Sequence, residues 1–141
     1  MMNRQQILEF LNRVQTCHLA TVENGEPRVR GMMMYRADES GILFHTGTGK
    51  DLFNQIKAQP CVEICFNDLQ AGIQVRVRGR AEIVEDQSLK EEIVERRDFM
   101  KPWIKEHGYG LLGVFRITDC EASVWTFAAN CAPKEFISLH P

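Results

Sequence analysis

Apolar and polar residues alternate in one short segment after another of this 141-residue chain. The clearest case is 73–84, where Val75 and Val77 alternate with Arg76 and Arg78. Such a period of two places successive side chains on opposite faces of a β-strand. Similar patterns occur at 17–23, 27–35, 42–46, 61–67, 111–118 and 122–127. Six or seven short strands in so small a chain predict a closed antiparallel barrel, because closure removes exposed strand edges.

Helical spacing of apolar residues replaces the alternation in three places. These are residues 3–14, the segment between Lys50 and Pro60, and the charged segment 86–107, which we expect Pro102 to interrupt. The chain contains no internal repeat, linker or low-complexity stretch. We therefore expect residues 1–141 to form a single β-dominated α+β domain with helices flanking the strands.

Composition excludes several classes of function. Lys and Arg number 17 against 19 Asp and Glu, so the basic excess of a nucleic-acid-binding protein is missing. No run of 18 apolar residues predicts a membrane span. Five cysteines without a CxxC motif or a secretory signal predict reduced thiols in the cytoplasm. Cys61 and Cys65 are expected to be buried, and the scattered histidines predict no metal site.

A glycine-rich loop, residues 46–51 (Thr-Gly-Thr-Gly-Lys-Asp), joins a predicted strand to a predicted helix. Glycines let the backbone approach a ligand, and the helix N-terminal amides together with Lys50 favour an anion. Asp51 stands where a P-loop needs Ser or Thr, which excludes that motif. The alternative is a plain turn with Thr48 as the helix cap.

Arginines line two of the predicted strands. Arg28 and Arg30 share one face, and Arg76, Arg78 and Arg80 share a face of another strand. An arginine that converges with the lysine of the glycine-rich loop would form a phosphate clamp. The alternatives are solvated faces or ion pairs, for example with Glu63. No nucleophile or acid–base group stands out, so the catalytic residues are unknown.

Several motifs follow one another in a recognisable order. They are Gly25-x-Pro27-x-Val29-Arg30, Leu43-Phe44-x-Thr46, Gln59-Pro60-x-Val62, Gln74-Val75-x-Val77-x-Gly79-x-Ala81-Glu82, and Phe115-Arg116-Ile117 with a later Trp125. With these spacings, over about residues 17–127, the chain resembles the pyridoxamine 5′-phosphate oxidase-like, FMN-binding split β-barrel proteins. The resemblance implies an antiparallel split β-barrel of six to seven strands with flanking helices.

The resemblance also implies a non-covalent FMN site at the interface of a homodimer. The positions that match the family's flavin contacts are Arg30, Gly31, Met32, Met33, His45, Thr46, Lys50, Gln74 and Trp125. Among them, Arg30 and Lys50 match phosphate contacts. Trp125 matches a tryptophan that packs on the cofactor, whereas composition alone favours a place in the core for it.

The chain departs from the family where the substrate of the oxidases binds. Tyr35 stands in place of a lysine, and residues 130–133 offer no Arg-x-His motif. Oxidation of pyridoxamine phosphate is therefore not expected. The resulting hypothesis is a cytoplasmic FMN-dependent oxidoreductase acting on an unidentified small molecule. A flavin-type reductase of nitro compounds or electron carriers, a non-enzymatic haem- or flavin-binding protein, and an interaction domain stay open as alternatives.

Overall fold

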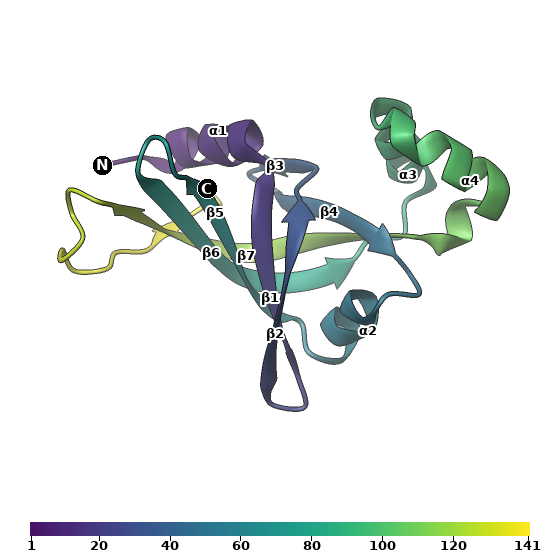
Figure 1. Ribbon diagram of the computed structural model, residues 1–141, viewed down its shortest axis with the longest axis horizontal. Coiled ribbons are helices and arrows are strands. Elements are labelled where there is room, and N and C mark those ends of the chain that lie inside the picture. Colours follow the sequence, from purple (N-terminus) through teal and green to yellow (C-terminus); the bar gives the residue numbers. More distant parts are fainter.

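The computed structural model describes all 141 residues (Figure 1). In chain order, the elements are α1 (Arg4–Val14), β1 (Thr16–Glu23), β2 (Glu26–Met33), β3 (Arg36–Asp38), β4 (Gly41–Gly47), α2 (Asp51–Ala58), β5 (Cys61–Asp68), β6 (Ile73–Ile83), α3 (Gln87–Arg96), η1 (Asp98–Met100), α4 (Lys101–His107), η2 (Tyr109–Leu111), β7 (Leu112–Thr126) and β8 (Ile137–Ser138).

One antiparallel sheet contains all of the strands. Its order is β2-β1-β5-β6-β7-β4-β3, and β8 pairs with β7. This confirms the predicted antiparallel split β-barrel, but the expected closure is wrong because β2 and β3 end the path without pairing. Asn12 of α1 explains the open end at β3: its side chain donates to the carbonyl of Ala37 at 2.8 Å and accepts from the Ala37 N–H at 2.9 Å. Helix α1 thus occupies the edge that closure would require.

Two strand boundaries differ from the sequence-based expectation. The predicted strand 27–35 ends at Met33, because the Tyr35 N–H bonds to Leu43 and the chain crosses to pair with β4. The predicted strands 111–118 and 122–127 are one strand, β7, with Asp119 at φ 53°. A single residue in the left-handed region bends a strand without ending it.

The main core fills the inside of the curved sheet. Phe44 and Phe115 stack at 5.3 Å between ring centroids, and both are fully buried. A second, smaller cluster lies on the outer face of β4 and β7, where α3 and α4 cover residues such as Leu43 and Val114. The helical segment breaks at 97–100, and Pro102 lies in the first turn of α4 instead of interrupting a helix.

The cysteines do not all follow the expectation of burial. Cys61 is exposed and Cys65 is half-buried, because Val62, Ile64 and Phe66 of β5 face the core and the two thiols face outwards. Every helix of the protein is too short or too polar to traverse a lipid bilayer.

Candidate functional site

Arg30 reaches from β2 towards the inner side of the sheet, where α2 packs. Its Nη1 donates to the Thr21 hydroxyl at 2.8 Å and to the carbonyl of Leu19 at 3.2 Å, and its Nη2 donates to the side-chain oxygen of Gln55. These bonds use at most three of the five N–H donors of a guanidinium. The Nε–H and one Nη2 hydrogen have no partner in the chain, and they can bind an anion.

Thr21 and Gln55 hold this arginine in place, and sequence reasoning missed both. Each is buried, and the Thr21 hydroxyl donates to the Gln55 oxygen at 2.6 Å. The sequence feature that could have identified Gln55 is its position on the apolar face of α2, beside Leu52 and Ile56. Burial lowers the pKa of Arg30, while the nearby Asp51 and Glu23 oppose this effect.

Lys50 is the N-cap residue of the same helix. No side chain caps α2, because the Thr48 hydroxyl bonds instead to the carbonyl of Gly110 at 3.2 Å. The capping role considered for Thr48 is therefore wrong. A Cβ at Gly49 would meet no atom within 4 Å, so the space in front of the helix start is open. Uncapped amides, an exposed lysine and open space together suit a bound anion.

Gly31, Met32 and Met33 lie on β2, which is an edge strand. An edge strand leaves a row of backbone N–H and C=O groups unpaired, so this segment can bond to a ligand through its backbone. All three residues line a cavity of about 430 Å³ together with residues of β1 and β5.

His45 and Thr46 follow one another on β4 and point to opposite faces of the sheet. Thr46 is buried on the inner side, whereas His45 faces outwards beneath the helical segment. There the Nε2 atom of His45 lies 2.7 Å from Nη1 of Arg97. Burial, Arg97 and Lys50 lower the pKa of His45 to about 4. Arg97 was not identified from the sequence, because it lies 52 residues from its partner.

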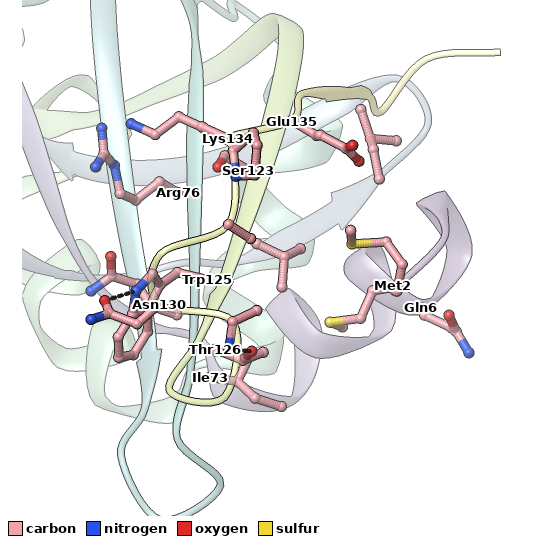
Figure 2. Close-up of a pocket in the computed structure, with 17 residues that line it drawn as sticks. Met2, Gln6, Ile73, Arg76, Ser123, Trp125, Thr126, Asn130, Lys134 and Glu135 are labelled. Carbon is pink, nitrogen blue, oxygen red and sulfur yellow. Dashed lines mark hydrogen bonds between the residues drawn. The ribbon is translucent and has the colours of Figure 1, made fainter.

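Gln74 and Trp125 are cross-strand partners on β6 and β7. They line a cavity of about 590 Å³ between the outer face of the sheet, the N-terminal residues and the loop after β7 (Figure 2). Trp125 Nε1 donates to Asn130 Oδ1 at 2.9 Å, and Gln74 Nε2 donates to Asn67 Oδ1, also at 2.9 Å. Trp125 is only half-buried, so the expectation of core packing from composition is wrong.

Two of the three arginines of β6 are ion-paired, which is one of the alternatives considered above, whereas Arg80 Nη1 donates to Cys61 Sγ at 3.3 Å. Arg76 bonds to Glu63 at 3.0 Å and Arg78 to Glu121 at 3.3 Å. Among the sequence-predicted arginines, Arg30 is thus the one with free donors beside Lys50.

The predicted contact residues do not gather at one place in a single chain. Met33 and Trp125 lie in the same transverse row of the outer face, but β1, β5 and β6 separate their strands. Four strand spacings correspond to roughly 19 Å along the sheet. This is more than a three-ring heterocycle extends.

Comparison with known proteins decides the family. The profile described as pyridoxamine 5′-phosphate oxidase matches residues 4–118, which is most of the chain. The protein belongs to the pyridoxamine 5′-phosphate oxidase family.

Relatives of this family member share parts of its sequence. A pyridoxine/pyridoxamine 5′-phosphate oxidase of Mycobacterium leprae is 39% identical over 69 residues, which are 49% of this chain and 32% of the relative. One of Agrobacterium fabrum is 36% identical over 78 residues, 55% of this chain and 38% of the relative. The matched segment thus spans about a third of these relatives' length.

Solved structures match more of the chain. A NimC/NimA family protein of Clostridium acetobutylicum has a TM-score of 0.78 at 25% identity, covering 96% of this chain and 92% of that one. A pyridoxamine 5′-phosphate oxidase-related, FMN-binding protein of Nostoc punctiforme has a TM-score of 0.63 at 17% identity, covering 94% and 88%. The second likeness shows the shared fold.

The residues of this family member fit the phosphate end of a flavin mononucleotide. A dianion needs several hydrogen-bond donors of positive charge in an open place. Arg30 offers unpartnered N–H groups, Lys50 is exposed, and the start of α2 has no side-chain cap. The edge of β2 and Trp125, which match the family's contacts to the flavin ring, lie apart on the outer face of the sheet.

Proposed function

We propose that the protein is an FMN-dependent oxidoreductase with a flavin site shared between two copies of the chain. The observation that carries this proposal is the arginine of β2 that packs against α2. Arg30 is fixed by three internal hydrogen bonds and still has free donors, and it bonds to the helix whose start carries Lys50 and uncapped amides. No carboxylate accepts from the remaining N–H groups of this half-buried guanidinium, so a bound anion would complete its hydrogen bonding.

The separation along the sheet supports a homodimer. One flavin cannot touch both Met33 and Trp125 of the same outer face, but a second copy can bring its Trp125 to the β2 edge of the first. The outer face carries exposed apolar residues that pairing would bury. Val29 is 68% exposed and Phe127 is 80% exposed. In this arrangement each site combines the phosphate clamp of one copy with Gln74 and Trp125 of the other.

When bound, FMN would supply hydride transfer to and from a small organic molecule. The chain's own residues bind and orient: Arg30 and Lys50 hold the phosphate, and the edge of β2 offers backbone groups to the ring. Tyr35, whose hydroxyl donates to Glu92 at 2.6 Å, replaces a substrate-binding lysine of the family. The proposed substrate is therefore a small molecule other than pyridoxamine phosphate.

A comparison of two flavins tests this function. Purified protein is titrated with FMN and with riboflavin, which lacks the phosphate, and flavin fluorescence is followed. We expect FMN to bind at least tenfold more tightly, and Lys50→Ala to remove about tenfold of that preference. Lys57→Ala, at the other end of α2, is the matched control and should change nothing. Failure to bind FMN, or equal binding of the two flavins, would contradict the proposal.

A further inference from the structure

Arg97 connects the helical segment to the candidate site. It is the C-cap residue of α3, and its guanidinium makes two hydrogen bonds to the sheet. Nη1 lies 2.7 Å from His45 Nε2, and Nη2 donates to the carbonyl of Met34 at 2.7 Å. The guanidinium carbon also lies 5.3 Å from the centroid of the Tyr35 ring. Arg97 forms no ion pair within the chain, so its role is not to neutralise a carboxylate.

The contact with Arg97 fixes the chemical state of His45. A guanidinium has only donors, so Nε2 must accept, and the ring must be neutral with its hydrogen on Nδ1. The electrostatics agree, since burial and then the charges of Arg97 and Lys50 lower the pKa of His45 to about 4. No carboxylate bonds to the ring to oppose them. The Nδ1–H group makes no hydrogen bond within the chain.

We propose that Arg97 is a positioning residue that presents His45 as an uncharged Nδ1–H donor to an acceptor atom of the bound flavin. This inference rests on the proposed function, since it needs a bound flavin. His45 immediately precedes Thr46 and the glycine-rich loop that leads to Lys50. The Nδ1–H group has no partner within the chain and is half-buried, so it is available to a ligand acceptor. A neutral donor also acts equally across the neutral pH range, whereas an imidazole with an ordinary pKa changes charge there.

The helical segment 86–107 would then serve to place Arg97 against His45. Its apolar residues cover the outer face of β4 and β7, and its break at Arg97 places one side chain against His45. The break therefore delivers a charged group to the site, while the flanking helices hold that group by packing.

Nitrogen NMR of the His45 ring in the flavin-free protein tests the positioning role directly. In the wild type, the ring should stay neutral down to about pH 4 with its hydrogen on Nδ1. In Arg97→Met, the titration midpoint should move up towards the ordinary value of 6.5, and the hydrogen should distribute over both nitrogens. Arg96→Met is the matched control from the same turn of α3 and should behave like the wild type.

Two results would overturn the positioning role. One is a wild-type ring that carries its hydrogen on Nε2, and the other is an Arg97→Met midpoint equal to that of the wild type. If Arg97→Met does not fold, Arg97→Lys keeps the charge but lacks the two-armed geometry that also reaches Met34. Its ring hydrogen should then no longer be confined to Nδ1, and confinement to Nδ1 would count against the inference.

Flavin binding separates this inference from the proposed function. We expect His45→Phe to weaken FMN binding about tenfold, the effect of one hydrogen bond. Arg97→Met should make FMN affinity depend on pH between 5 and 7, whereas Arg96→Met should not. A wild type that does not bind FMN would contradict the proposed function. Wild-type binding that His45→Phe leaves unchanged would overturn the donor role while the proposed function stands.

Discussion

The two regions that carry the predicted flavin contacts differ in how they are built. Beside α2, Arg30 is held by hydrogen bonds to the buried side chains of Thr21 and Gln55, and the region is polar and charged. On the outer face of β6 and β7, Gln74 and Trp125 are half-buried, uncharged and next to the loop after β7. The first region is suited to recognise a phosphate, and the second to pack against a ring. Under the proposed function, a complete site combines the two regions from different copies, because they lie apart along one sheet.

The largest effect should come from the α2 region. Arg30→Ala should weaken FMN binding on the order of a hundredfold, because it removes a two-pronged charged contact with the phosphate. Riboflavin affinity should change little. The melting temperature should also fall, because the buried side chains of Thr21 and Gln55 lose a hydrogen-bond partner. Calorimetric titration with both flavins measures the first effect and thermal unfolding the second.

Arg28→Ala is the matched control for this prediction. Arg28 lies two residues earlier on β2, but its side chain bonds to Glu23 and Glu26 in an exposed position. Its removal should leave both FMN affinity and melting temperature nearly unchanged. Equal effects of the two substitutions would mean that the α2 region is no phosphate site.

A smaller and chemically different effect should come from the second region. Trp125→Leu should weaken FMN and riboflavin by the same factor, about three- to tenfold, because the indole contacts the ring that both ligands share. Phe99→Leu, an exposed aromatic on η1, serves as the control. A loss of affinity for FMN alone would contradict the assignment of the phosphate to the α2 region and of the ring to Trp125.

A separate effect concerns stability and its dependence on pH, and it comes from His45 of β4, outside both regions. The pKa of His45 is lowered from 6.5 to about 4 in the folded protein, so the unfolded chain binds more protons between these values. The stability contribution is therefore present above pH 6.5 and declines as the pH falls towards 4, by about 2 kcal/mol at pH 5. Chemical denaturation at pH 7 and pH 5 measures the decline.

His45→Phe should flatten this pH dependence. Trp125→Leu should preserve it, because an indole does not titrate. If both variants decline like the wild type, His45 is not the group responsible.

Local chemistry was accessible from the sequence, whereas long-range partners were not. The Asn24-Gly25 turn, the helix after Lys50 and the alternation in β6 depend on neighbouring residues, and the structure shows each of them. The link between Arg30 and α2 could be anticipated only as a possibility, because the sheet brings together residues 25 positions apart.

Gln55 and Arg97 show where sequence reasoning ends. Gln55 is a buried polar residue whose partners come from two other elements, and Arg97 looks like one more surface charge at a helix end. The open barrel has the same origin, since it depends on Asn12 bonding to the edge of β3. Such contacts are fixed by tertiary packing, and no local period or motif reports them.

Mixing two defective chains tests the central claim most directly. The Arg30→Ala chain and a Gln74→Ala/Trp125→Ala chain are unfolded together, refolded, and titrated with FMN beside each chain alone. If a site combines the two regions from different copies, mixed dimers regain one intact site, and about a quarter of all sites bind FMN with wild-type affinity. If the mixture contains no site of wild-type affinity, the shared-site account is wrong.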